Sequence, residues 1–329
     1  MKKVIPWLKQ SSTFTLLAII IVLAFLPVFG IPHTWLLYLF LFFSYLAMAN
    51  MWNLLAGYCG LISLCQPAFL GLAGYTLVIF TWSGLPFYLG IIVGGIIAAA
   101  FAVVISVPVF RLKGIYFAVG TLIVPEILKI VFYLWKPVGG ELHGGGAGYM
   151  LKGVTGLTLK ENYWFALVIG IGSIIFVRSI LRSKMGLAIA AIRDNDNTAA
   201  SSGINVFGLK LYVFVISAFV TGIAGGIFFV YQGYIEPVST FNVRWTMTLM
   251  IATVAGGMGT QGGPVIGTII VVVLHFLLTR YEGISLLVQG LILVTVMLLA
   301  PRGILGSLRE TRAYLAVRQL AMRISTRPS

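Results

Sequence analysis

Long apolar runs make up most of the chain, and short segments rich in Gly, Pro or charged residues separate them. A helix needs about 20 consecutive apolar residues to cross a bilayer. On that measure the chain divides into about ten candidate spans: 13–30, 35–56, 58–80, 87–109, 114–135, 163–181, 211–232, 246–257, 264–279 and 284–300. The pattern predicts an all-α, polytopic membrane helix bundle of about 8–10 transmembrane segments, some of them short or broken.

Two of these stretches are unusually rich in Gly and Pro. Residues 57–80 contain Pro67 and four glycines, which predicts close helix packing and a broken backbone hydrogen bond inside the bundle. Residues 246–279 form either one overlong span or two short spans joined by the loop 256–264 (GGMGTQGGP). We favour the hairpin, because a single crossing would place six C-terminal arginines outside. Its irregular loop should be sheltered by protein, since unpaired amides are costly in lipid.

Composition and charge support a membrane location and give an orientation. The chain is 60% hydrophobic and 9% charged, whereas soluble domains are roughly 25% charged. Its net charge of +14 comes from basic residues at the ends of apolar runs, a pattern that does not indicate nucleic acid as a partner. With the N-terminus inside, 16 of the 22 Lys and Arg residues fall in four cytoplasmic segments: 1–12, 110–113, 178–210 and 301–329. Both termini are therefore expected in the cytoplasm.

The same topology gives a domain organisation. Residues 1–306 are expected to form the transmembrane domain, with an external loop at about 136–161 and a cytoplasmic loop at about 182–210. The first apolar run is interpreted as a permanent anchor, because no small-residue cleavage site follows it. Residues 307–329 form a basic cytoplasmic tail, either an amphipathic helix on the membrane surface or a frayed end.

Sequence motifs for catalysis or cofactor binding are weak. The Gly257–Gly262 match to G-x-G-x-x-G lies between membrane segments without a βαβ unit, and the glycine-rich run 139–148 lacks the Lys-Ser/Thr of a phosphate loop. His33, His143 and His275 are too scattered for a metal site, and no Ser-His-carboxylate set is apparent. We therefore expect no catalytic residues, no metal and no cofactor bound by this chain, which is predicted not to be an enzyme.

A few polar residues interrupt the apolar spans. Glu126 and Lys129 share one helix face at a spacing of i, i+3. They either neutralise each other, line a permeation path or seat a partner subunit, because isolated charges are costly in a bilayer. Asn53, Ser63 and Gln66 likewise face either neighbouring helices or a water-filled path. These five residues are the candidate lining of a translocation path.

The most informative soluble segment is the predicted cytoplasmic loop. Its Asp and Asn residues precede an Ala-Ala pair and can cap a short helix that Gly203 ends. Such a helix is suited to docking another protein, although a plain connecting loop has the same composition. The candidate contact residues are Arg193, Asp194, Asn195, Asp196, Asn197, Thr198, Ala199, Ala200 and Gly203.

Five blocks of sequence, in the family's order, resemble the permease subunits of ATP-binding-cassette (ABC) importers for branched-chain amino acids, the LivM/LivH family. They are 53–64 (NLLAGYCGLISL) with 68–75, 114–117 (GIYF) with 126–129 (EILK), 186–204, 256–267 (GGMGTQGGPVIG) and 300–306 (APRGILG). The closing Ala-Pro-Arg-Gly favours the LivM-like subunit. The chain differs from the family at Cys65-Gln66, where Gly-His is common, and at Asp194 and Asp196, where Glu is usual.

The resemblance implies a bacterial inner-membrane permease that works by alternating access. In this family a second permease subunit, LivH-like or a second copy, completes the path, and two cytoplasmic ABC ATPases hold the ATP and Mg²⁺. A periplasmic binding protein delivers a branched-chain or related amino acid, and the residues 193–204 would contact an ATPase. The alternatives are an ion-coupled secondary transporter of small polar solutes that uses Glu126 and Lys129, and an integral-membrane enzyme.

Overall fold

The structure is a computed structural model that describes residues 21–136, 138, 144–153, 158–278 and eight single positions: 287, 288, 290, 291, 294, 295, 298 and 303. The first part of the predicted span 13–30, most of the predicted span 284–300, His143 and the tail 307–329 lie outside the described residues.

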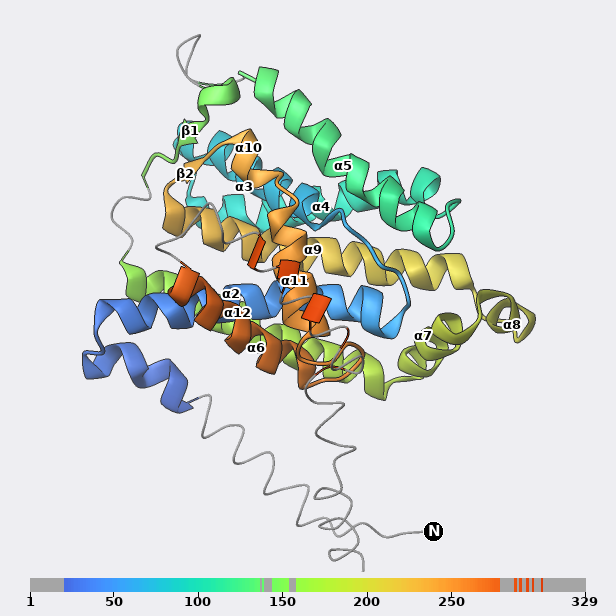
Figure 1. Cartoon of the computed structure of the whole chain (residues 1–329). Helices are drawn as coiled ribbons and strands as arrows, with labels where there is room; N and C mark the ends of the chain where they lie inside the picture. Colours follow the sequence, from blue (N-terminus) through green and yellow to red (C-terminus); the bar gives the residue numbers. More distant parts are fainter. Residues whose placement is uncertain are drawn as a thin grey trace, which may run out of the picture.

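Six long helices form the body of the protein (Figure 1). They are α2 (His33–Trp52), which continues into the π-helix η2 (Asn53–Tyr58), α3 (Gln66–Trp82), α4 (Phe87–Val109), α5 (Ile115–Leu134), α6 (Leu159–Arg182) and α9 (Val206–Gln232). The shorter elements are η1 (Leu26–Phe29), η3 (Gly145–Ala147), α7 (Lys184–Asp194), α8 (Asp196–Ser201), α10 (Pro237–Thr240), α11 (Arg244–Val254), α12 (Gly263–Leu278) and the strands β1 (Tyr149–Met150) and β2 (Tyr234–Ile235).

Within the described part of the chain, five helices are long and apolar enough to cross a membrane: His33–Tyr58, Phe87–Val109, Ile115–Leu134, Leu159–Arg182 and Val206–Gln232. The 17-residue α3 and the 16-residue α12 are shorter apolar helices of the same bundle. The chain is therefore an all-α, polytopic membrane bundle, as the apolar pattern predicts.

The bundle has two distinct ends (Figure 1). α7 and α8 project at one end, and the antiparallel pair β1–β2 lies with α10 at the other. α2 runs through the middle, where it packs against α6, α9, α11 and α12. Because helices surround α2 on several sides, its apolar residues are spread around its axis instead of forming one stripe. α5 lies along the edge of the bundle and buries few side chains.

Small residues bring these helices close together. The backbone of Gly94 in α4 packs on Ala73 of α3, and Gly170 in α6 packs on the backbone of Phe43 in α2. A Cβ atom at Gly94 would lie 2.9 Å from the Ala73 carbonyl oxygen, and one at Gly170 would lie 2.9 Å from the Phe43 carbonyl oxygen. Association through small residues is typical of membrane helices, since lipid offers no hydrophobic drive between them.

The predicted break at Pro67 is wrong in position. Pro67 lies in the first turn of α3, where a missing N–H breaks no helical bond. The interruption lies upstream, in the π-helix η2 and the non-helical residues 59–65, so the predicted span 58–80 begins too early. Neighbouring side chains satisfy this backbone: Trp52 Nε1 and Thr246 Oγ1 donate to the carbonyl oxygens of Ser63 and Leu64, and Leu64 N–H donates to Thr121 Oγ1.

The hairpin interpretation of residues 246–279 is confirmed. α11 and α12 pack against each other, and residues 255–262 connect them. The contact is very close at Gly267, where an added Cβ atom would lie 1.7 Å from the Ala252 carbonyl oxygen. A side chain at residue 267 would therefore separate the two helices.

Two predicted spans begin too late in the chain. α6 starts at Leu159 instead of 163, because Thr158 and Glu161 form a capping box at its N-terminus. α9 starts at Val206 instead of 211, because the Asn205 side chain accepts a hydrogen bond from the N–H of Gly208. Polar caps extend both helices beyond their apolar runs.

Candidate functional site

The segment between α6 and α9 folds into two short helices, α7 and α8 (Figure 1). Asn195 separates them in an extended conformation, and its Oδ1 accepts hydrogen bonds from the N–H groups of Asn197 (2.9 Å) and Thr198 (3.1 Å). α8 ends before Gly203, whose φ of +82° suits a residue without a side chain. The predicted capped helix that ends at Gly203 is confirmed, and α7 is a second helix before it.

α8 is held in place by contacts on one side. Asp196 forms an ion pair with Lys210 at the start of α9, and Ala199 is only 2% exposed. The opposite side of α8 is exposed at Asn197, Thr198 and Ala200. On α7, Leu187 is 76% exposed although it is a large apolar residue. The two helices therefore present a fixed, mixed polar and apolar surface at this end of the bundle, which we call the α7–α8 surface.

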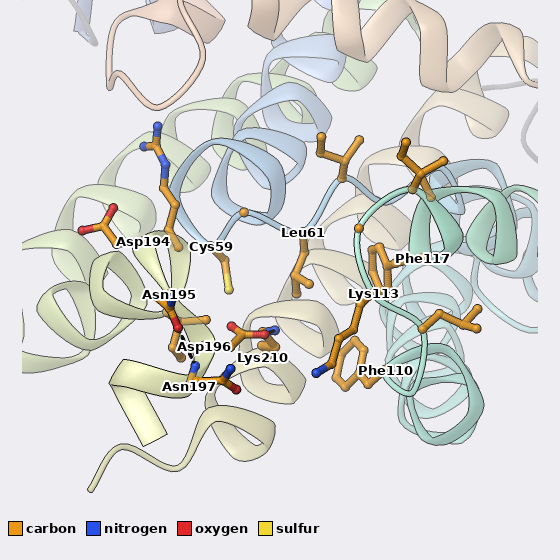
Figure 2. A pocket seen from close by; sticks show the side chains of 18 residues that line it. Cys59, Leu61, Phe110, Lys113, Phe117, Asp194, Asn195, Asp196, Asn197 and Lys210 are labelled. Atoms are coloured by element: carbon orange, nitrogen blue, oxygen red, sulfur yellow. Dashed lines mark hydrogen bonds and ion pairs between the residues drawn. The ribbon is translucent and has the colours of Figure 1, made fainter. Parts of the chain in front are cut away.

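A cavity of about 610 Å³ lies beside this surface (Figure 2). Asp194, Asn195, Asp196 and Asn197 lie on one side of it, and Lys113, Phe110 and Phe117 lie on the other. Leu61 and the buried Cys59 thiol come from the non-helical segment after η2. Most of the residues that line the cavity come from three segments that are distant in sequence: 59–62, 110–118 and 192–197.

Asn53 and Ser63 form contacts within the protein. The Asn53 amide binds the α11–α12 connection, because its Nδ2 donates to Thr260 O (3.0 Å) and its Oδ1 accepts from Gly259 N (2.8 Å). Ser63 Oγ lies 3.0 Å from Cys65 Sγ, and the Ser63 side chain is fully buried. Both side chains hold non-helical backbone in place.

Gln66 is also buried, between α3 and α9. Its Oε1 accepts a hydrogen bond from Thr221 Oγ1 at 3.1 Å, while its Nε2 has no partner among the described residues. Like Asn53 and Ser63, it lies outside the lining of the 610 Å³ cavity.

Glu126 and Lys129 form an ion pair on α5, as their spacing predicts. The pair is partly open, since the Lys129 and Glu126 side chains are 31% and 49% exposed. No other element of the described chain covers this face of α5, whose exposed residues include Ile123, Ile127 and Ile130. The structure therefore separates the pair from the buried Asn53, Ser63 and Gln66.

At the opposite end, a small polar and aromatic cluster ties β1 to the neighbouring loops. The Tyr149 hydroxyl donates to Val138 O at 3.1 Å, and burial raises the pKa of Tyr149 above its usual value. Tyr234 OH donates to Ala147 O at 2.6 Å. These neutral hydroxyls act as hydrogen-bond donors that fix the loop between α5 and α6.

Sequence reasoning did not find the contact between Gly57 and Gly259 or the cavity residues Lys113, Phe110 and Phe117. Both glycines stand in blocks that carry the family resemblance, which marks them as notable without pairing them. No spacing rule, however, indicates that two glycines about 200 residues apart touch.

These elements define an all-helical, polytopic membrane protein with an exposed two-helix segment at one end. Residues 35–301 match the family described as "Branched-chain amino acid transport system / permease component", and the chain belongs to this family.

Several permease proteins are similar to the chain. LivM of Escherichia coli (strain K12), a "High-affinity branched-chain amino acid transport system permease protein", is 28% identical over 78% of the chain and 66% of its own length. The probable LivM of Methanocaldococcus jannaschii is 26% identical over 59% of the chain and 56% of its own length. LivH of Salmonella typhimurium is 30% identical over 45% of the chain and 48% of its own length. No solved structure matches the chain.

Proposed function

We propose that this chain is the membrane-spanning permease subunit of an ABC importer and moves branched-chain or related amino acids by alternating access. The observation that carries the proposal is the α7–α8 surface, a capped and anchored pair of helices that projects from the bundle in a chain of the permease family. The chain would supply the path and the contact with the motor. ATP and Mg²⁺ would be held by partner ATPases.

The basic residues support an orientation. Arg111, Lys113, Arg178, Arg182, Lys184, Arg193 and Lys210 all lie near the α7–α8 end. Under the positive-inside rule this end would face the cytoplasm of a bacterial inner membrane, with both chain termini on the same side. The end with β1, β2 and α10 would then face a periplasmic substrate-binding protein.

The proposed partners follow from this arrangement. Two ABC ATPases would bind at the cytoplasmic side, each through one copy of the α7–α8 surface. A LivH-like permease subunit, or a second copy of this chain, would complete the transmembrane pathway. Lipid would cover the uncharged exposed face of α4.

We further propose that the exposed face of α5 lies against this second permease subunit and borders the translocation path. α5 carries a carboxylate near its midpoint, and the Glu126 side chain is 49% exposed in the single chain. A charge that faced lipid at that depth would cost about 2.5–3.5 kcal/mol on insertion scales. A protein or aqueous surface next to α5 removes that cost. Asn53, Ser63 and Gln66 would then support the path from within the subunit.

Neutralising both charges on α5 tests this placement. We expect the double variant E126Q/K129Q to assemble with its partners and to transport at least 10-fold more slowly, because neutral amides replace the two charged groups that border the path. The measurement is uptake of labelled leucine into proteoliposomes. The matched control is Ile127→Leu, an exposed uncharged position on the same helix. Undiminished uptake by the double variant would mean that Glu126 and Lys129 only neutralise each other's charge and do not border the path.

The energy source distinguishes the proposed importer from an ion-coupled transporter. With the complete complex in cells, we expect uptake to stop when ATP is depleted and to persist when an uncoupler collapses the proton gradient while ATP is maintained. The reverse result would select a secondary transporter driven through Glu126 and Lys129.

A further inference from the structure

Two glycines and one amide bring η2 against the α11–α12 connection. The Asn53 side chain binds the backbone of both Gly259 and Thr260. A Cβ atom at Gly57 would lie 2.5 Å from Gly259 N, so the two backbones are in direct contact. Gly60 follows at a φ of +76°, where the chain turns away from η2. We call Asn53, Gly57, Gly60 and Gly259 the glycine joint.

Arg193 of the α7–α8 segment lies across this joint. A Cβ atom at Gly60 would lie 3.5–3.8 Å from Cα, Cβ and Cγ of Arg193, which is ordinary van der Waals distance. A Cβ atom at Gly259 would lie 2.9 Å from Nη1 of Arg193. The arginine therefore spans from the turn after η2 to the α11–α12 connection, and the absence of side chains at both glycines leaves room for it.

The position also suits the positive charge of Arg193. η2 ends at Tyr58, so its last carbonyl groups present partial negative charge near Gly57 and Gly60. The Arg193 backbone is itself in the last turn of α7. A guanidinium at this position is attracted to two helix C-termini at once, and its planar group can lie flat against the backbone of a glycine.

A rigid contact connects Arg193 to the rest of its segment. Ile192, the preceding residue, is buried in the same apolar cluster as Cys59 and Leu61, and Asn195 caps α8 two residues later. A displacement of α8 therefore moves α7 and the Arg193 side chain together. The glycine joint receives this displacement, and through the Asn53 amide it connects α2 to the α11–α12 hairpin.

We propose that Arg193 is a positioning residue that transmits movement of the α7–α8 segment to the glycine joint and from there to the α11–α12 hairpin. The proposal rests on the proposed function, since it takes the segment to be moved by an ATPase. It assigns to Arg193 a role inside the membrane subunit, distinct from a role in holding the ATPase.

The test measures transport and ATP hydrolysis in the same proteoliposomes that contain the complete importer. We expect Arg193→Ala to keep the ATPases bound and hydrolysing ATP, and to lower the number of substrate molecules moved per ATP at least 10-fold. Arg193→Lys should recover part of this ratio, because it keeps the charge without the planar guanidinium. Arg178→Ala, which removes a basic residue from the body of α6, should leave the ratio unchanged.

A double-mutant cycle adds a readout that a purely structural role would not move. If Arg193 acts through Gly259, then Arg193→Ala and Gly259→Ala should each lower the ratio, and the double variant should be no worse than the poorer single variant. If the losses in the two single variants multiply in the double variant, the proposal is overturned. An unchanged number of substrate molecules moved per ATP in Arg193→Ala would also overturn it. Loss of the ATPases from Arg193→Ala would also overturn it and would place Arg193 in the docking surface. Failure of the wild-type chain to retain an ATPase would instead refute the proposed function.

Discussion

Gly267→Ala is expected to separate α11 from α12 and to be the most destabilising single methyl addition in the hairpin. The new Cβ atom would lie 1.7 Å from the Ala252 carbonyl oxygen and 2.5 Å from its carbon, both backbone atoms that cannot rotate away. Adding a methyl to a tightly packed core typically costs about 1–3 kcal/mol, and a backbone obstacle places this variant at or above the upper limit.

The measurement is the temperature at which half of the detergent-solubilised protein remains monodisperse after heating. The matched control is Gly172→Ala in α6, a helical glycine at which an added Cβ atom meets no atom within 4 Å. There we expect no loss, or a gain of up to about 1 kcal/mol, because alanine is the better helix former. Equal melting temperatures for the two variants would contradict the close approach of α11 and α12.

Ala199→Pro is expected to abolish association with the partner ATPases while leaving the transmembrane bundle folded. The Ala199 N–H donates to Asn195 O at 3.0 Å, and Ala199 is the buried contact of α8. Proline removes this donor and collides with the carbonyl oxygen four residues earlier, at a cost of about 3 kcal/mol or more inside a helix. Because α8 has only six residues, it has no other turn to compensate.

The experiment is co-purification of the ATPases with the tagged chain, together with the size-exclusion profile as a check of folding. Deletion of Asp194–Ser202 should give the same loss. Ala200→Ser is the matched control, since Ala200 is the exposed neighbour of Ala199 in the same helix. A stable, active complex that retains its ATPases despite the proline or the deletion would refute the role of α8.

Among the described residues, the sequence alone located most of the helices and the polar segment between α6 and α9. Apolar run length predicted the spans, because lipid requires every spanning backbone to be helical and uncharged. The capping of α8 by Asn195 was also predictable, because an N-cap is a local interaction between residues two or three positions apart. The helix ends at Leu159 and Val206 were missed, since their caps lie outside the apolar runs.

These local rules do not predict contacts between segments that are distant in sequence. Pro67 was assigned a break in a helix that it in fact begins, because proline suits a first turn as well as it disrupts an interior one. The Asn53 amide was seen as polar, but its partner Gly259 depends on how η2 and the α11–α12 hairpin pack. A single sequence carries no signal for such a pairing, so the candidate path residues could be named without their partners.

The central position of α2 sets an order for biosynthesis. α2 leaves the ribosome early, but α6, α9, α11 and α12, which cover it, are made more than 100 residues later. Until then the sides of α2 are in contact with lipid acyl chains. The Asn50 Nδ2 group has no access to Ser173 Oγ, which accepts its hydrogen bond at 3.0 Å in the complete bundle. Nascent chains that stall before α6 therefore hold a buried helix without these neighbours, and they are natural targets for membrane quality control.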